Sequence, residues 1–287
     1  MKKQYVIGLA ILLSVSGVLS SCGNKVSKNT GDLVFDSIQV NKTTHLFGDT
    51  AKPACNLIIN YIYPIKSSDK RLKDSLNSYF TSACFNVKDP EMSAKEVVKQ
   101  FTDNYTNQYR HDLEPMYTED QKQKKNEDEE TSVNSWYSYY KGVQGHVQFY
   151  KGNLLIYRVN YNEYTGGAHG MYTTTFLNIN LATLRPIHLD DIFTGDYSEL
   201  LTDLLWNQLM ADNKVTTRKE LEDLAYGSTG DLVPTDNFYL TKEGIVFYFN
   251  VYEFTPYVMG PVQIKLPYEI MQHIMVNDNS IINELRN

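Results

Sequence analysis

The sequence predicts an α+β protein in which antiparallel β-meander sheets pack with a few amphipathic helices. Three observations predict this class. Strand-like and helix-like segments come in runs without regular alternation, glycine-containing turns join the strand-like segments, and the helix-like segments repeat apolar residues at intervals of three and four. The chain has 287 residues, 42% of them hydrophobic, so it can bury two modest cores, and we expect two sequential subdomains.

Residues 1–21 have the layout of a secretory signal peptide. Two lysines precede an apolar run that is shorter than the roughly 20 residues needed to span a bilayer. The segment ends in Leu19-Ser20-Ser21-Cys22, which resembles the bacterial lipobox, where the cysteine is lipidated and becomes the new N-terminus. We therefore expect a lipid anchor at Cys22 that attaches the mature protein to a membrane.

Residues 22–48 are polar and predict a flexible tether, joined by an early strand near 33–40. The first α+β subdomain is expected over residues 49–130. Its predicted elements are a strand at 57–63, a helix at 72–83 and a second helix that begins at the capping box Ser93-Ala94-Lys95-Glu96.

The charged stretch 119–130 marks the expected boundary with a second α+β subdomain over residues 131–287. There, β-branched and aromatic runs separated by turns predict an antiparallel meander, followed by helices and further strands. The predicted strands cover 143–150, 154–164, 172–181, 237–240, 245–252 and 262–266, and the predicted helices cover 197–209, 218–225 and 267–276.

Two further cysteines, Cys55 and Cys84, lie in the first subdomain. An exported compartment permits a disulfide between them, and we expect one, which would close a loop of about 30 residues. Two buried free thiols are the alternative. Neither cysteine has a histidine or Cys-x-x-Cys neighbour that would favour the thiolate, so a catalytic cysteine is not expected.

Composition and spacing argue against several classes of function. A formal net charge of −7 without a long Lys/Arg run argues against nucleic acid as a partner. The histidines are too widely spaced for one helix or finger to offer two of them to one ion, so no metal or other cofactor is predicted. Common catalytic motifs are absent, and Asp190-Asp191 is interpreted as a pair of turn and helix-cap residues.

Two strand connections, 161–170 and 251–261, carry the candidate ligand-binding residues. These are Tyr161, Glu163, Tyr164 and His169 in the first connection, and Tyr252, Glu253 and Tyr257 in the second. Glycines beside His169 permit another group to approach closely, which suits a ligand loop and equally a tightly packed corner. In the functional interpretation, His169 is a polar anchor or base oriented by Glu163 or Glu253; in the structural one, it holds the loop by hydrogen bonds.

The same residues resemble a known family. Three segments, Tyr161-x-x-Tyr164-Thr165-Gly166-Gly167-Ala168-His169-Gly170, Leu189-x-Asp191-Ile192-Phe193 and Tyr252-Glu253-x-x-Pro256-Tyr257-x-x-Gly260-Pro261, resemble domain of unknown function 3298, the C-terminal half of RsiV-like extracellular domains. Upstream, Ile59-x-Tyr61-x-Tyr63-Pro64 is similar to the partner domain of RsiV-like and PdaC-like proteins.

That resemblance implies an extracellular binding domain. The RsiV branch is a membrane-anchored anti-sigma factor whose outer domain binds lysozyme, and in the PdaC branch the module sits beside a separate peptidoglycan deacetylase domain. Here a lipobox stands where RsiV has its anti-sigma segment, and the sequence ends near Asn287, so we expect neither sigma-factor control nor deacetylase activity.

We therefore expect an exported cell-envelope lipoprotein, on the periplasmic face of a membrane or at the cell surface. It would bind a peptidoglycan fragment or a wall-targeting protein such as lysozyme without catalysis. A wall-glycan hydrolase or deacetylase that uses His169 with Glu163 or Glu253 is one alternative, and an envelope scaffolding lipoprotein is another. The 22 tyrosines, about twice the usual share, are assigned mainly to half-buried strand faces.

Overall fold

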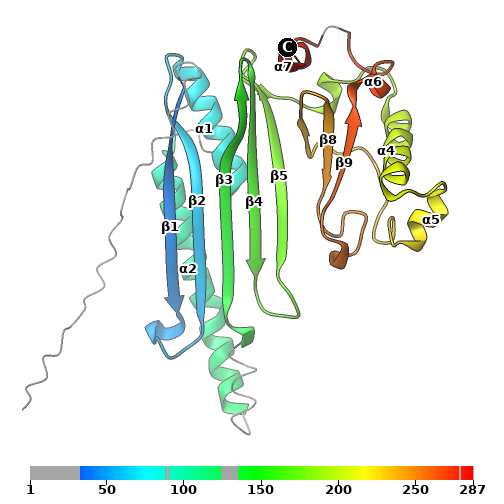
Figure 1. The fold of residues 1–287 in the computed structure, drawn as a ribbon. Helices are drawn as coiled ribbons and strands as arrows, with labels where there is room; N and C mark the ends of the chain where they lie inside the picture. The colour runs from blue at the N-terminus through cyan, green and yellow to red at the C-terminus, as the bar shows by residue number, and fades with distance from the viewer. Residues whose placement is uncertain (1–32, 88, 90, 124–134, 278, 287) are drawn as a thin grey trace, which may run out of the picture.

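The computed structural model describes residues 33–87, 89, 91–123, 135–277 and 279–286. The α+β class is confirmed: the chain forms a six-stranded and a three-stranded sheet, with helices packed on both. The second sheet lies beyond β5 and carries its own helices (Figure 1). The signal segment 1–21 and Cys22 lie outside the described residues. No helix in the described part of the chain is long and apolar enough to cross a bilayer.

The first two strands, β1 (Val34–His45) and β2 (Ala54–Lys66), form a long antiparallel hairpin. A short 3-10 turn, η1 (Leu46–Gly48), joins them. The early strand expected near 33–40 is present and extends to His45, so the expected tether is strand and 3-10 turn from Val34 to Gly48. Apolar side chains of β1 pack against the core beneath the sheet and hold it there.

Two helices, α1 (Lys70–Phe85) and α2 (Ala94–Gln123), connect β2 to β3. The carboxylate of Asp69 accepts a backbone hydrogen bond at the start of α1. The predicted capping box is confirmed at α2, where the Ser93 hydroxyl and the Glu96 carboxylate each accept from the other's backbone N–H, at 3.3 and 2.8 Å. Both helices lie against one face of the sheet (Figure 1).

The next strands complete the first sheet, with β3 (Tyr139–Lys151), β4 (Leu154–Tyr164), β5 (Met171–Asn180) and the short β6 (Arg185–Pro186). From β3 to β6 they form the expected antiparallel meander, but β3 pairs in parallel with β2 because two helices cross over between them. The sheet therefore continues across the division expected near residue 130, and the structure places the division between sheets after β6.

The helices and the sheet enclose the first core. Phe80 of α1 stacks on Tyr157 of β4 with ring centroids 3.6 Å apart, and both side chains are fully buried. The Tyr157 hydroxyl donates to the carbonyl of Ile62 on β2 at 2.8 Å. Because the hydroxyl is satisfied, the ring can be buried at no polar cost.

The remaining elements build a second lobe around its own apolar core. They are η2 (Leu189–Asp191), α4 (Ser198–Asn213), α5 (Arg218–Asp223), β7 (Phe238–Leu240), β8 (Gly244–Phe249), η3 (Tyr257–Met259), β9 (Val262–Pro267), α6 (Tyr268–Met271) and α7 (Ser280–Arg286). The helix predicted over 267–276 is confined to α6, and α7 was not predicted.

Asparagine side chains join the two sheets edge to edge. The Asn237 amide accepts from the backbone N–H of Phe176 at 3.0 Å and donates to one carbonyl on β5 and one on β8. The Asn178 side-chain amide likewise donates to the backbone carbonyl of Phe238 and accepts from the backbone N–H of Leu240, both on β7. These contacts replace ladder hydrogen bonds between β5 and β7, so they fix the second lobe beside the first sheet.

The disulfide expected between Cys55 and Cys84 is not present, and both are buried free thiols. They lie in separate clusters: Cys55 packs under α2 with Tyr109 and Leu113, whereas Cys84 packs near Tyr157. Burial raises the pKa of the Cys55 thiol to about 11 and that of Cys84 to about 12. Neither is poised as a nucleophile, because both stay protonated at neutral pH.

Candidate functional site

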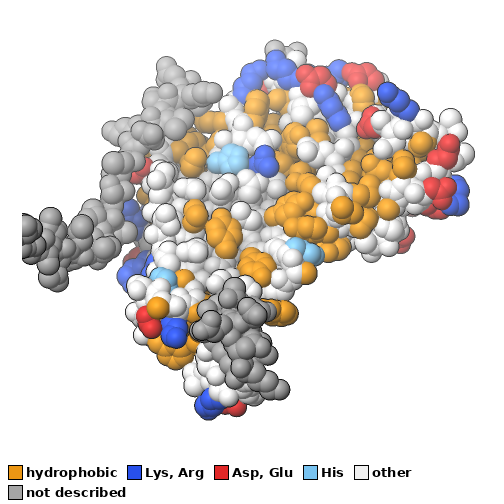
Figure 2. All heavy atoms as spheres, turned by 60° about the horizontal axis from the view of Figure 1, so that its bottom comes forward, with side chains coloured by type: hydrophobic (Ala, Val, Ile, Leu, Met, Phe, Trp, Pro, Cys, Tyr) orange, Lys and Arg blue, Asp and Glu red, His pale blue; other side chains and the backbone are white. Residues whose placement is uncertain are grey.

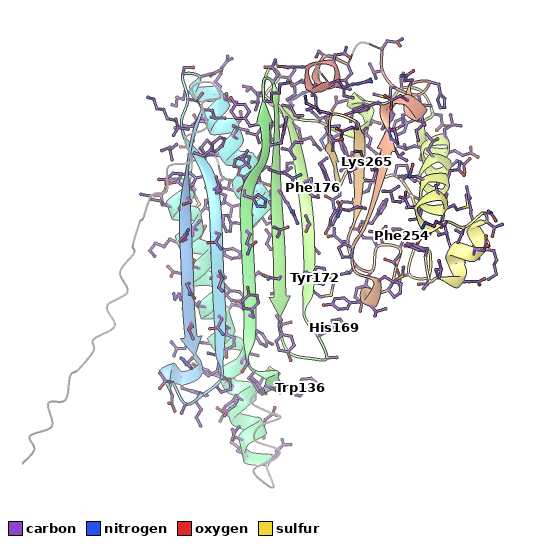
Figure 3. All side chains as sticks on the ribbon, in the orientation of Figure 1. Trp136, His169, Tyr172, Phe176, Phe254 and Lys265 are labelled. Atoms are coloured by element: carbon purple, nitrogen blue, oxygen red, sulfur yellow. The ribbon has the colours of Figure 1, made fainter. Side chains whose placement is uncertain are left out.

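The loop 165–170 between β4 and β5, here called the glycine loop, carries His169 at the lower end of the sheet (Figure 3). Gly166 and Gly167 have φ angles of +85° and +101°, which a side chain would strain. A Cβ atom at Gly166 would lie only 2.7 Å from the carbonyl oxygen of Trp136. The glycines therefore let the loop pass tightly over the start of β3.

Four aromatic side chains gather beside this loop, and we call them the aromatic cluster. His169 stacks on Tyr257 with ring centroids 4.2 Å apart, and Tyr257 lies 5.6 Å from Tyr172 and 5.7 Å from Tyr252. His169 and Tyr252 are exposed, and the other two are half-buried. The cluster thus joins β5, the glycine loop and the connection after β8 into one accessible surface.

Both ring nitrogens of His169 have partners. Nδ1 donates to the carbonyl of Gly170 at 2.9 Å, and in that neutral tautomer Nε2 accepts from the Tyr252 hydroxyl at 3.3 Å. Tyr252 has a φ of +69°, a backbone conformation that residues other than glycine adopt rarely. In this backbone conformation, the Tyr252 hydroxyl reaches the His169 ring.

The two carboxylates proposed to orient His169 point elsewhere. Glu163 forms an ion pair with Lys141 at 2.9 Å, on the side of the sheet that the helices cover. Glu253 accepts from the backbone and the amide of Asn250 at 2.8 and 3.2 Å and closes the turn after β8. Within the described residues, neither carboxylate is hydrogen-bonded to His169, so the acid-base arrangement of the functional interpretation is not assembled.

The other two tyrosines of the first connection are also structural in this geometry. The Tyr161 hydroxyl donates to the carbonyl of Ala83 at 2.8 Å and secures the end of α1, and burial raises its pKa. The Tyr164 hydroxyl donates to Gly167 at 2.9 Å and holds the glycine loop. Of the seven predicted residues, the structure brings together His169, Tyr252 and Tyr257.

Asp190 and Asp191 act as the turn and helix-cap residues that the sequence indicated. Asp191 accepts the backbone N–H of His188 at 2.9 Å and caps η2, and Asp190 accepts from the Tyr197 hydroxyl at 2.6 Å. Among the residues that the structure describes, no three His, Cys, Asp or Glu side chains are grouped closely enough to hold a metal ion.

The face of the six-stranded sheet that faces away from α1 and α2, here called the open face, was not considered in the sequence analysis. Tyr172 of the aromatic cluster lies on it, as do His146 and Arg158, which form a cross-strand pair. Side-chain amides continue the open face across β1 to β4: Gln39, Asn41, Asn56, Asn60, Gln144, Asn160 and Asn162. Because successive side chains of a strand point to opposite faces, the polar residues at alternate positions of β1 to β4 could have identified this face from the sequence.

Figure 2 brings the lower end of the molecule forward. Uncharged and hydrophobic side chains occupy most of this surface, and charged side chains lie mainly at its margins. An uncharged surface rich in amides and aromatic rings is suited to a ligand with hydroxyl and amide groups.

Comparisons with known proteins place the chain in a family. A family model described as a protein of unknown function, DUF3298, matches residues 190–269, and a model described as deacetylase PdaC matches residues 50–172. A crystal structure of a DUF3298 family member from Bacteroides fragilis is 64% identical, covers 90% of this chain and 99% of its own, and superposes with a TM-score of 0.84. The chain belongs to the DUF3298 family. Both expected resemblances are thereby confirmed.

A DUF3298 family protein from Pseudomonas aeruginosa has the same fold at 15% identity, with a TM-score of 0.59 over 86% of this chain and 95% of its own. No curated protein matches the sequence. Residues 173–189, near the end of the first sheet, separate the two matched segments. The motif 161–170, which the sequence analysis assigned to the DUF3298 part, falls instead in the PdaC-like segment.

Proposed function

We propose that this DUF3298 family member is a lipid-anchored protein of the cell envelope whose folded part binds a wall glycan without catalysis. The lipobox at Cys22 and the signal segment before it support the location. The aromatic cluster is the observation that carries the binding function.

The cluster offers what a sugar ring needs. Sugar rings present C–H faces that pack on aromatic rings, and hydroxyls that need polar partners at the ring edge. Tyr257, stacked on His169 and flanked by Tyr252, forms such a platform. The rings come from separate strand connections and are held at fixed spacing, so the platform is formed before the ligand binds.

Catalysis through His169 is less well supported by this geometry. Glu163 and Glu253 are engaged by Lys141 and Asn250, and the His169 nitrogens by Gly170 and Tyr252. A general base needs a free nitrogen within reach of the proton it removes, and a partner carboxylate that orients the ring. A glycan platform requires neither.

The binding proposal is tested by calorimetry with the folded protein and a soluble peptidoglycan disaccharide. We expect heat of binding with the parent protein, at least tenfold weaker affinity for Tyr257→Ala, and unchanged affinity for Val258→Ala. Val258 is a matched control because it adjoins Tyr257 and is 89% exposed. No heat with the disaccharide would overturn the proposal.

The same samples separate the alternatives. Heat with lysozyme but not with the disaccharide would replace the glycan by a protein partner. Cleavage or deacetylation of the glycan, lost in His169→Ala at unchanged melting temperature, would show an enzyme. No binding to either ligand would leave a scaffolding role.

The anchor is tested by expressing the full chain in a bacterium and following incorporation of labelled palmitate. We expect labelled protein in the membrane fraction and loss of both label and membrane attachment in Cys22→Ala. A soluble, unlabelled parent protein would overturn this part of the proposal.

A further inference from the structure

We propose that a cavity on the open face, whose wall includes Arg158, is a second site that binds the carboxylate of an acidic sugar. This inference rests on the proposed glycan-binding function and extends it to the chemical class of the ligand. The cavity has a volume of about 410 Å³ and lies where β3, β4 and β5 meet the second sheet. Its lining residues are His146, Val147, Gln148, Arg158, Phe176, Tyr239, Tyr248 and Gln263.

The guanidinium of Arg158 is held in place with most of its donors unused. Its Nε donates to the Asn160 side-chain oxygen at 2.9 Å, and the group lies 5.6 Å from the Phe176 ring centroid. Over the part of the chain that the structure describes, no carboxylate forms an ion pair with it. The two terminal nitrogens therefore remain available to donate two parallel hydrogen bonds to a planar carboxylate.

The surroundings favour an anionic group. The protein has a formal net charge of −7, yet none of the cavity's lining residues is acidic. Burial lowers the pKa of His146, and the nearby Arg158 lowers it further. His146 is therefore neutral at neutral pH, and Arg158 is the one formal charge on the cavity wall.

The rest of the wall suits a sugar ring. Phe176 packs 4.7 Å from Tyr239 and 5.4 Å from Tyr248. Phe176 and Tyr248 are buried, so the half-buried Tyr239 is the ring that this wall exposes. The Tyr239 hydroxyl donates to the Gln263 amide at 3.1 Å, so the rim presents amide and hydroxyl groups. A carboxylate on Arg158 would place the attached ring beside Tyr239 and Gln263.

The cavity and the aromatic cluster share one strand. Tyr172 and Phe176 both point to the open face of β5, four residues apart, which is about 13 Å along a strand (Figure 3). Burial raises the pKa of Tyr172, and Tyr257 and then Tyr248 raise it further. A short oligosaccharide therefore reaches from one site to the other, with its neutral end on Tyr257 and its acid at Arg158.

The test compares a peptidoglycan disaccharide that carries its lactyl carboxylate with the same disaccharide converted to the amide. We expect the parent protein to bind the acid at least tenfold more tightly than the amide. Arg158→Gln should remove this difference, and Arg158→Lys should restore part of it. Equal affinities of the parent protein for acid and amide, or an undiminished preference in Arg158→Gln, would overturn the proposal.

A second measurement separates this proposal from the function on which it rests. This measurement is a nuclear magnetic resonance titration with glucuronate and with glucose. A single sugar can bind at Arg158 without contacting the aromatic cluster. We expect glucuronate alone to shift the Arg158 Nε–H resonance, in the parent protein and equally in Tyr257→Ala. If glucuronate binds there but the disaccharide does not, only the function proposed above fails. If glucuronate leaves that resonance unmoved, the carboxylate site is refuted whatever the disaccharide does.

Discussion

The two faces of the six-stranded sheet use the same strands for opposite purposes. Along β4, Tyr157 and Tyr161 turn toward the helices and are buried or nearly so, whereas Arg158, Asn160 and Asn162 turn to the open face. Alternate residues of one strand thus serve stability and, as we propose, recognition.

The difference explains the tyrosine excess. On the helix-covered face, the hydroxyls of Tyr157 and Tyr161 donate to the backbone carbonyls of Ile62 and Ala83. Those of Tyr61 and Tyr105 are buried without a hydrogen-bond partner among the described residues. Around the open face, Tyr252 bonds only the exposed His169 ring among the described side chains. Substitutions should therefore cost folding free energy on one face and ligand affinity on the other.

The largest effect on stability is expected for Phe80→Ala. Phe80 is fully buried and stacked on Tyr157, so its removal leaves a cavity that costs about 3–5 kcal/mol of unfolding free energy. Urea denaturation measures this. Met116→Ala, at a site that is 56% exposed on α2, should change it by less than about 0.5 kcal/mol. A loss below about 1 kcal/mol for Phe80→Ala would contradict the assigned core.

High pH should destabilise the helix-covered face. Burial raises the pKa of Cys84 to about 12 and of Cys55 to about 11, above the roughly 8.5 of an exposed thiol. Stability is therefore complete below about pH 8.5 and falls as the unfolded state loses these protons, by up to about 1.4 kcal/mol per pH unit for each thiol. Urea denaturation at pH 8, 9, 10 and 11 should show a steep loss that is shallower in Cys84→Ala. Identical slopes would contradict the burial of Cys84.

Removing a single hydroxyl should have a smaller effect on the same face. Tyr157→Phe loses the hydrogen bond to the Ile62 carbonyl and should cost about 1–2 kcal/mol, measured by urea denaturation. Tyr252→Phe, whose hydroxyl is at the surface, should cost less than about 0.5 kcal/mol. Equal costs for the two variants would remove the distinction between the faces.

The smallest effect on stability is expected at the aromatic cluster itself. Tyr257→Ala removes a half-buried ring with exposed neighbours and should change the unfolding free energy by less than about 1 kcal/mol in the same assay. A loss as large as that for Phe80→Ala would show that the cluster is a packed corner instead of a binding platform.

Local patterns in the sequence predicted the elements well. Strand alternation, turn glycines and the Ser93–Glu96 capping box depend on neighbouring residues, and the structure confirms them. The parallel pairing of β2 with β3 was missed, because two helices separate those strands in the chain. The hydrogen bonds of the Asn178 and Asn237 side chains between the two sheets likewise join residues far apart in the sequence, so no local pattern predicts them.

The candidate site was predicted in part. The glycines indicated the loop around His169, and its contact with Tyr257 follows the expected meeting of two strand connections. The pairing of Glu163 with Lys141 was not foreseen, because the strand's alternation, which places Glu163 on the same side as Tyr161, was not applied to it. Arg158 was missed because a single arginine within a strand carries no motif.

The most direct test of the account is ¹⁹F resonance of protein labelled with 3-fluorotyrosine, titrated with the acidic peptidoglycan disaccharide and assigned through single Tyr→Phe variants. We predict that Tyr172, Tyr239, Tyr248, Tyr252 and Tyr257 shift on binding, whereas Tyr61, Tyr157 and Tyr161 under the helices do not. Shifts confined to the helix-covered tyrosines, or no shifts at saturating disaccharide, would contradict the claim that the open face binds an acidic wall sugar.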